Sequence, residues 1–297
     1  MSTNDHQDRN RGVEKLSQAL SYRTVSLTER DSIDYGGYEG FLEFLEGAFP
    51  RFFEAADVQR INRYSLLCSL GGRTTEPGGS DESSSAEAPL PALFLAHYDV
   101  VPPSDESSWT HAPFSGAVAD GAVWGRGALD DKGSLVAMLE AVESLLEEGW
   151  SPARTVVFAF GHDEEIGGGE GAKAMAEQLK AQGKEFSFII DEGMTIVEPE
   201  LLPVVPRPLA LVGISEKGHV DIRITAEGTS GHSSTPPSST TAGAVARAVC
   251  RVEDNPFSFR MTEPVEELFS TLAPYSKGLH RFVLSRPRFF SPFLVRM

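Results

Sequence analysis

The pattern of apolar and polar positions divides the first hundred residues into helical and strand-like runs. Residues 12–53 carry leucine and phenylalanine at helical spacing, interrupted by Ser, Thr, Asp and Gly, which predicts outer helices. The runs RYSLLCSL (63–70) and ALFLAHYDV (92–100) have the length and the largely apolar character of buried strands. Residues 71–91 between them are rich in Ser, Gly and Pro, and they predict a surface loop within one domain.

Helices and strands alternate in the middle of the chain. Leucine and valine recur on one helical face over residues 135–146, and RTVVFAF (154–160) then predicts a buried strand. The Ala, Lys, Glu and Gln content of residues 169–181 predicts a helix, and FSFII (186–190) predicts a further strand. This alternation is typical of an α/β fold, in which a mostly parallel sheet is flanked by helices and ligands gather at the carboxyl ends of the strands.

The pattern changes from residue 209 onward. LALVGISEKG and HVDIRITAEG alternate like exposed antiparallel strands, and TAGAVARAVCRVED follows as an amphipathic helix. We therefore predict an α/β domain over residues 1–211 and the beginning of a smaller α+β domain over residues 212–297. The chain ends on the apolar run FFSPFLVRM, where a natural domain seldom stops, so we expect a truncated product.

Composition and charge narrow the class of protein. The 297 residues are 40% hydrophobic and 23% charged, which is sufficient for a globular core. The 43 acidic residues outnumber the 26 basic ones and give a formal net charge of −17. Such a balance argues against nucleic acid and against an anionic membrane as the main partner.

Cysteine usage and the first residues bear on the compartment. Cys68 lies in a strand-like run and Cys250 in a helical one, and two buried free thiols are favoured over a disulfide. The segment MSTNDHQDRNRGVEKL has no apolar core of a signal peptide, and no window approaches the ~20 apolar residues of a membrane span. These features favour a cytoplasmic location.

Candidate metal ligands begin at the end of the second predicted strand. The period of two in a strand places His97 and Asp99 on the same face, so the carboxylate can accept one imidazole N–H and leave the other nitrogen free for a metal. A histidine two residues from an aspartate is more often structural, and the pair carries little weight alone.

Two adjacent aspartates stand between glycines in GRGALDDKG (125–133), directly before a predicted helix. The ordinary explanation is an N-cap, in which an aspartate accepts backbone N–H groups at the start of the helix. That explanation accounts for one of Asp130 and Asp131 but not for both.

Acids also follow the next two strands. GHDEEIGG places Glu164 and Glu165 after the strand at 154–160, and Asp191 directly follows the strand at 186–190. Several like charges at one point repel one another unless a cation is present. One imidazole with several carboxylates suits zinc, cobalt or manganese, and bridging carboxylates suit a metal pair. The alternative is a metal-free α/β protein whose acids only solvate the edge of the sheet.

Motifs of other enzyme classes are absent from the sequence. The chain has no H-E-x-x-H, no G-x-S-x-G and no G-x-x-x-x-G-K-[ST], and GRGALD lacks the third glycine of a dinucleotide fingerprint. The acids at the strand ends are therefore the main indication of function in this sequence.

Five motifs in order carry a specific resemblance: AHYDVVP, WGRGALDDKG, GHDEEIGG, IIDEG and SGHSSTPP. Together they resemble the di-zinc metallopeptidase and amidohydrolase family of aminoacylase, glutamate carboxypeptidase and carboxypeptidase S. The chain is most similar to the branch of carboxypeptidase S and N-fatty-acyl-amino-acid synthase/hydrolase, from about Glu14 to the last residue. The resemblance implies a zinc-peptidase-like sheet with an inserted ferredoxin-like lid, and cleavage of the amide bond of a peptide or N-acyl amino acid. Relatives in this family are variously vacuolar, secreted or cytosolic.

The resemblance also implies a ligand set for two Zn²⁺ ions, with Co²⁺ or Mn²⁺ as substitutes. His97 would bind one metal, Asp130 would bridge both, Asp191 would complete the first site, and Glu165 would bind the second. The peptide bond after Asp130 would be cis.

Three further residues receive roles from the same resemblance. Asp99 would orient His97, and Glu164 would be the general base that activates the attacking water. His232 matches a lid histidine that stabilises the tetrahedral oxyanion, and in dimeric members that histidine comes from the partner subunit. A homodimer through the lid is therefore expected.

The chain departs from the family in one respect. The second metal needs a further histidine that comes after the lid, and His280, in SKGLHRFVLSRP, resembles lid sequence instead. Two functional hypotheses follow: a metal-dependent hydrolase of the carboxypeptidase or aminoacylase type, or a truncated, catalytically impaired member that acts at most as a binding module.

Overall fold

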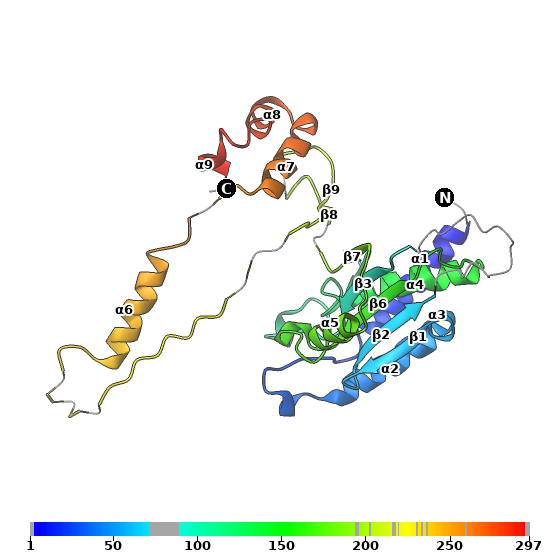
Figure 1. Cartoon of the computed structure of the whole chain (residues 1–297), viewed down its shortest axis with the longest axis horizontal. Coiled ribbons are helices and arrows are strands. Elements are labelled where there is room, and N and C mark those ends of the chain that lie inside the picture. Colours follow the sequence, from blue (N-terminus) through cyan, green and yellow to red (C-terminus); the bar gives the residue numbers. More distant parts are fainter. Residues whose placement is uncertain are drawn as a thin grey trace. The chain divides into compact units, whose positions relative to one another are not determined.

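The computed structural model forms two compact units, Met1–Glu192 and Gly193–Met297, which we describe separately (Figure 1). The residues described are 3–71, 89–193, 196–201, 203–215, 218, 220–229, 231–232, 234–235, 237–258 and 260–294. Most of the surface loop predicted between residues 71 and 91 falls outside them.

A mixed five-stranded sheet forms the centre of the first unit. In spatial order its strands are β1 (Asp57–Ile61), β2 (Ser65–Leu70), β6 (Val156–Gly161), β3 (Ala92–His97) and β7 (Phe188–Ile190). β1 pairs antiparallel with β2, and β2 with β6, whereas β3 runs parallel to both β6 and β7. The sheet flanked by helices is therefore confirmed, with its parallel part confined to β6, β3 and β7.

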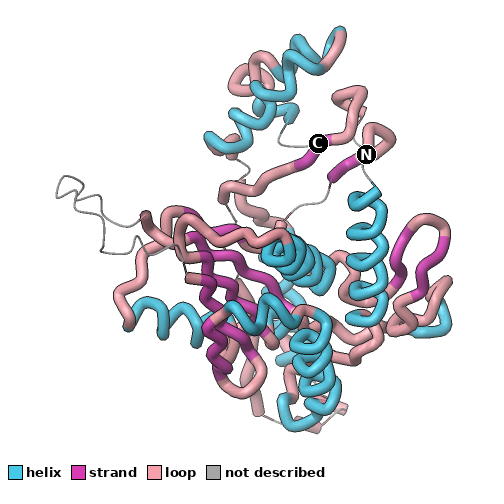
Figure 2. Tube along the Cα trace, turned by 90° about the vertical axis from the view of Figure 1, so that its right-hand side faces the viewer, coloured by secondary structure: helices cyan, strands magenta, loops and turns pink. Residues whose placement is uncertain are grey.

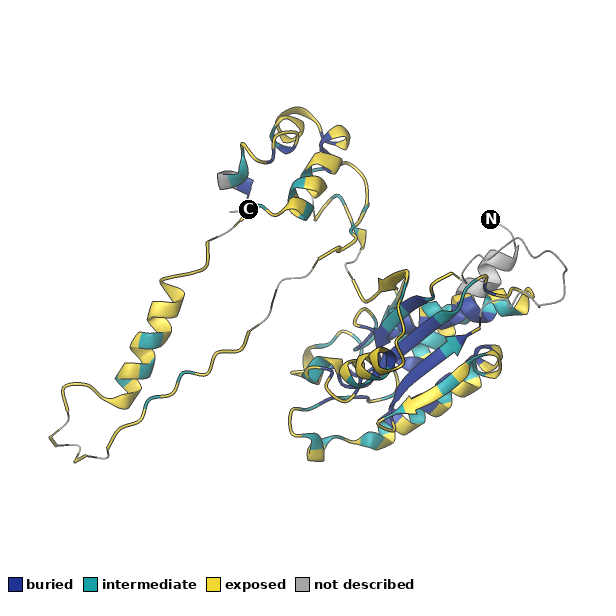
Figure 3. Cartoon of the chain, in the orientation of Figure 1, coloured by how far each residue is buried: buried dark blue, intermediate teal, exposed yellow. Residues whose placement is uncertain are grey.

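The central strands are buried on both faces, as Figure 3 shows in dark blue. Alternate residues enter two different clusters: Leu66 and Phe158 belong to one, and Leu67 and Val157 to the other. This division follows from the two-residue period of a strand and explains why both strands are unbroken apolar runs in the sequence.

Helices cover both faces of the sheet, and Figure 2 shows the strands lying among them. α2 (Tyr35–Ala48) and α4 (Lys132–Glu147) supply the larger, aromatic-rich cluster, whereas α5 (Ala172–Ala181) packs Met175 and Leu179 into the smaller one. The two remaining helices of this unit are α1 (Thr3–Ala19) and α3 (Pro50–Ala55). The helices predicted within residues 12–53, 135–146 and 169–181 are thereby confirmed.

A short hairpin links the end of β3 to α4. Its strands β4 (Ala117–Ala119) and β5 (Ala122–Trp124) pair antiparallel. The two turn residues, Asp120 and Gly121, have φ angles of 53° and 76°. Asp-Gly with two positive φ values is the preferred chemistry of a two-residue hairpin turn, a signal that our sequence analysis did not use.

The second unit has a small core and little sheet. Its strands are β8 (Ile196–Val197) and β9 (Leu209–Ala210), which pair antiparallel. Its helices are α6 (Thr241–Glu253), α7 (Glu263–Leu272), α8 (Gly278–Leu284) and α9 (Ser291–Leu294). α6 confirms the predicted amphipathic helix, and the Thr240 hydroxyl caps it by accepting the Gly243 N–H.

The prediction of antiparallel strands after residue 209 is wrong beyond Ala210 for the described residues, which carry no strand between 211 and 229. Val212, Ile214, Val220 and Ile222 are all exposed. An alternating run needs a partner strand against which to bury its apolar side, and the described part of this unit supplies none to these residues. The assignment of residues 212–297 to a lid stays a prediction.

Both cysteines are free thiols, as the sequence analysis expects, but only Cys68 is buried. Cys250 is exposed on α6, so its expected burial is wrong. Burial raises the pKa of the Cys68 thiol to about 12, which keeps it protonated and unreactive. Over the residues with described placement, no helix has the length and apolarity to cross a membrane.

Candidate metal centre

The candidate centre lies at the edge of the sheet where three neighbouring parallel strands end. His97 is the last residue of β3, and Asp191 and Glu192 follow β7. The short 3-10 helix Glu164–Ile166 follows β6, and the loop before α4 brings Asp130 to the same edge. In open α/β sheets, ligands bind at the carboxyl ends of the strands.

His97 presents one nitrogen to Asp99 and the other to a group of carboxylates. Its imidazole is 4% exposed, and Nδ1 lies 3.0 Å from the backbone oxygen and 3.3 Å from the carboxylate Oδ1 of Asp99. Nε2 lies 3.0 Å from Asp130 Oδ1, 3.0 Å from Glu192 Oε2 and 3.8 Å from Glu164 Oε2. Asp99 thus contacts Nδ1 through both its backbone oxygen and its carboxylate, and its predicted role in orienting His97 stays a prediction.

Among the described residues, two sets of three side chains bring ligand atoms within 4.8 Å of one another: His97, Asp130 and Glu165, and His97, Asp131 and Glu192. An imidazole nitrogen with carboxylate oxygens is a donor set that zinc, cobalt and manganese accept. The residues present therefore fit a divalent metal.

The carboxylates hold positive charge on His97. Burial, the largest effect, lowers the pKa of the imidazole, but the hydrogen bond and charge of Asp99, with the charges of Glu192 and Glu164, raise it to about 10. Burial and the nearby acids raise the pKa of Glu192 to about 7, against the opposing charge of His97. The site thus concentrates negative charge that a bound cation would neutralise.

The two adjacent aspartates have different surroundings. The Asp130 side chain is 65% exposed and faces His97, whereas Asp131 is buried and its Oδ2 accepts the backbone N–H of His97 at 3.4 Å. Asp131 occupies the N-cap position of α4 without making a side-chain cap hydrogen bond, so the ordinary N-cap explanation fails. The peptide bond between them is cis, as the resemblance implies.

The two predicted glutamates follow β6 in a turn that Asp99 fixes. Glu165 is half-buried and belongs to the set with His97 and Asp130, whereas the side chain of Glu164 is 48% exposed. Burial is the main cause that raises the pKa of both carboxyl groups, with the neighbouring acids adding to it. Their backbone N–H groups donate to Asp99, at 3.0 Å for Glu164 and 3.1 Å for Glu165.

Asp191 is not among the described side chains whose ligand atoms converge with those of His97, and its role as a ligand stays a prediction. It is exposed and accepts the N–H of its own neighbour, Glu192, at 2.9 Å. The residue of this pair that reaches His97 is Glu192. Neither Glu192 nor Asp131 is among the ligands predicted from the sequence. The sequence carried both acids, but a motif with two adjacent acids does not by itself indicate which one turns inward.

His232 belongs to the second unit. It is exposed, and its Nδ1 lies 2.8 Å from the hydroxyl of Ser234. It borders a hollow of about 550 Å³ at the start of α6, together with Glu227 and Thr240. Its expected role as a hydrogen-bond donor to the tetrahedral oxyanion stays a prediction.

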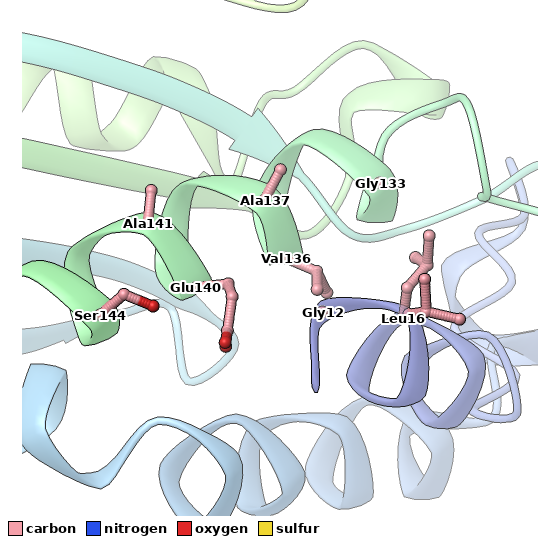
Figure 4. Close-up of a pocket in the computed structure, with 9 residues that line it drawn as sticks. Gly12, Leu16, Gly133, Val136, Ala137, Glu140, Ala141 and Ser144 are labelled. Atoms are coloured by element: carbon pink, nitrogen blue, oxygen red, sulfur yellow. The ribbon is translucent and has the colours of Figure 1, made fainter. Parts of the chain in front are cut away.

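The first unit has a hollow of about 430 Å³ between α1 and α4 (Figure 4). It is lined by Gly12, Val13, Leu16, Gly133, Val136, Ala137, Glu140, Ala141 and Ser144. Its one acid, Glu140, pairs with Arg11 at 3.2 Å and also with Lys15. This lining has no group of convergent catalytic side chains.

Comparison with known proteins identifies relatives. The model of peptidase family M20/M25/M40 matches residues 93–277. The chain is 38% identical over 290 residues to probable carboxypeptidase S-like 2 of Dictyostelium discoideum, covering 96% of this chain and 53% of that protein. It is 36% identical over 294 residues to N-fatty-acyl-amino acid synthase/hydrolase PM20D1 of Xenopus tropicalis, covering 98% and 54%. Carboxypeptidase S of Saccharomyces cerevisiae is 36% identical over 290 residues, with 93% and 47% covered.

The chain thus spans about half the length of the curated relatives it matches. Among solved structures, human carnosine dipeptidase 1 aligns with a TM-score of 0.49 at 19% sequence identity. That alignment covers 66% of this chain and 40% of the dipeptidase.

Proposed function

Because the chain belongs to peptidase family M20/M25/M40, we propose that it carries a metal-dependent hydrolase site that cleaves the amide bond of a peptide or an N-acyl amino acid. The observation that supports this most directly is the convergence of Asp130 and Glu192 on the free nitrogen of His97. The two substrate classes come from the names of the relatives, which include carboxypeptidase S and N-fatty-acyl-amino acid synthase/hydrolase.

By the family resemblance, His97, Asp130, Glu165 and Asp191 would hold the metals, with Zn²⁺ as the ion we propose and Co²⁺ or Mn²⁺ as substitutes. Glu192 Oε2 lies 3.0 Å from His97 Nε2, so we add Glu192 as a candidate ligand. When bound, the metal supplies a Lewis acid for the amide carbonyl and lowers the pKa of water.

Glu164 is the general base in this proposal. Its carboxylate is accessible to substrate, and it lies next to His97 and Asp99. It accepts a proton from water as the water oxygen bonds to the carbonyl carbon, and it then gives this proton to the leaving nitrogen as the C–N bond breaks. The raised pKa of Glu164, caused mainly by burial, makes its carboxylate a stronger base for the proton of the water.

We also propose that residues 212–297 are the lid, that His232 stabilises the developing oxyanion, and that two copies pair through this region. The exposed alternating residues Val212, Ile214, Val220 and Ile222 support a pairing role, because such a run becomes stable when it joins another strand. Sedimentation velocity on the purified chain tests the pairing of two copies. A dimer is expected, and a monomer at all concentrations contradicts the pairing.

Replacement of Glu164 tests the hydrolase assignment. Glu164→Ala is expected to lower turnover of N-acyl amino acids or dipeptides by about a hundredfold or more, the contribution typical of a general base. Metal content is expected to stay unchanged, as determined by elemental analysis. Glu170→Ala, at an exposed glutamate in the same segment, is the matched control and is expected to keep full turnover. Equal turnover in both variants would remove Glu164 from the mechanism.

A further inference from the structure

We propose that Ser26 is a positioning residue of the metal centre, which acts by fixing the Asp99 carboxylate and through it both His97 and the turn that carries Glu164 and Glu165. The inference rests on the proposed metal-dependent function. It adds a residue from outside the five motifs that carry the family resemblance.

The Asp99 carboxylate joins three separate segments. Its Oδ1 lies 3.3 Å from His97 Nδ1 and accepts the Glu164 N–H at 3.0 Å. Its Oδ2 accepts the Glu165 N–H at 3.1 Å and the Ser26 hydroxyl at 2.5 Å. Asp99 is fully buried and Ser26 is 3% exposed, so water does not readily replace these bonds. A single carboxylate therefore couples the first metal ligand to the general base.

Ser26 limits the rotation of this carboxylate. Oδ2 has two donors, and removal of the hydroxyl leaves it with the Glu165 N–H alone. A buried carboxylate that loses a donor tends to turn toward the donors that remain. Such a turn would shift Asp99 relative to His97 and to the Glu164 N–H at once. Ser26 therefore holds two functional groups without touching either.

The fold places Ser26 by a short backbone pairing. Val25 and Val100 form a parallel bridge, with the Ser26 N–H donating to the Val100 oxygen at 3.1 Å and the Val100 N–H donating to the Thr24 oxygen at 2.9 Å. This pairing begins three residues after His97 and directs the Ser26 side chain to Asp99. The Thr24 hydroxyl instead donates to the backbone oxygen of Tyr98 at 2.5 Å.

Thr24 and Ser26 thus provide a matched pair of variants. Thr24→Val and Ser26→Ala each remove one buried hydroxyl and one hydrogen bond from the same three-residue segment, but only Ser26 bonds Asp99. Both variants are expected to lose a similar amount of thermal stability. A difference between them in metal binding is then attributable to Asp99.

The experiment measures Co²⁺ affinity by visible absorption, and hydrogen exchange at the Glu164 and Glu165 amides in the metal-free full chain. Ser26→Ala is expected to weaken Co²⁺ binding by about tenfold or more, the usual effect of losing a group that orients a metal ligand, and to speed exchange at both amides. Thr24→Val is expected to change neither.

Ser26→Ala binding Co²⁺ as tightly as the unaltered chain overturns the inference, and so does a Thr24→Val variant that weakens binding equally. Failure of the unaltered chain to bind Co²⁺ overturns the proposed function itself. The two failures are therefore distinguishable in one set of titrations.

Discussion

At the scale of single residues, the site is organised around the two nitrogens of His97. Nδ1 is held by Asp99, and Nε2 faces Asp130 and Glu192. In the metal-free chain these acids favour a proton on His97, whereas a metal requires the neutral ring. A metal and a proton therefore compete for the same nitrogen.

This competition predicts the pH dependence of metal binding. The folded-state pKa of His97 is raised from its ordinary value of 6.5 to about 10, so its protonation stabilises the metal-free fold below pH 6.5, and this contribution is lost as the pH rises through 10. Metal binding must displace this proton and, below about pH 7, the proton of Glu192, so apparent affinity is expected to rise at least about tenfold per pH unit from about pH 6 to about pH 8. Titrations with Co²⁺ at constant ionic strength measure it. An affinity that is constant or falls over this range would show that no proton leaves.

Sequence reasoning could predict most of the site because the predicted strand order carries its ligands to one edge. His97, Asp130 and Glu165 were candidates, and their ligand atoms do converge. Asp131 and Glu192 are not among the predicted ligands, because the local backbone selects which of two adjacent acids points inward and the sequence does not show that backbone. Ser26 could not be found at all, since its role depends on a pairing between distant segments.

At the scale of elements, β7 is an exposed edge. Phe188, Ile189 and Ile190 are 45%, 60% and 46% exposed, and within the described residues β7 pairs with β3 alone. An apolar strand with unpaired backbone groups is a template for association with other chains. We expect this edge to dominate aggregation of the purified chain.

Ile189→Lys tests this expectation. A lysine at the exposed edge is expected to slow aggregation several-fold without lowering the melting temperature by more than a few degrees. Light scattering at a fixed concentration follows the process. Ile196→Lys is the matched control, because this residue is 66% exposed and lies on β8 in the second unit. Equal protection by both lysines would reflect net charge rather than the edge.

The strands differ in how well the sequence predicts them, because some need a particular partner strand in order to form. β2, β3 and β6 were predictable because burial on both faces, or nearly so, gives largely apolar runs. β1, with the half-exposed sequence DVQRI, has too weak a pattern for prediction. Beyond Ala210 the alternating run predicted strands that need a partner, and the described part of the second unit offers none to these residues.

At the scale of the whole molecule, the relatives confirm the resemblance to the carboxypeptidase S branch that five short motifs carried. The relatives are about twice as long as this chain, so activity, substrate and dimer formation remain proposals for it. The competing hypothesis, a binding module without turnover, shares the same fold. Metal binding at His97 is the property that the hydrolase requires.

The metal content of the purified chain tests metal binding at His97 most directly. The chain is incubated with Zn²⁺ and dialysed exhaustively, and elemental analysis is then expected to find at least about one ion per chain in the unaltered protein. The control is His232→Gln, which changes an exposed side chain of the second unit and is expected to keep the same ion. His97→Ala is expected to lose that ion. An unaltered chain without bound metal, or a His97→Ala variant that keeps it, would contradict the assignment of this sheet edge as a metal centre.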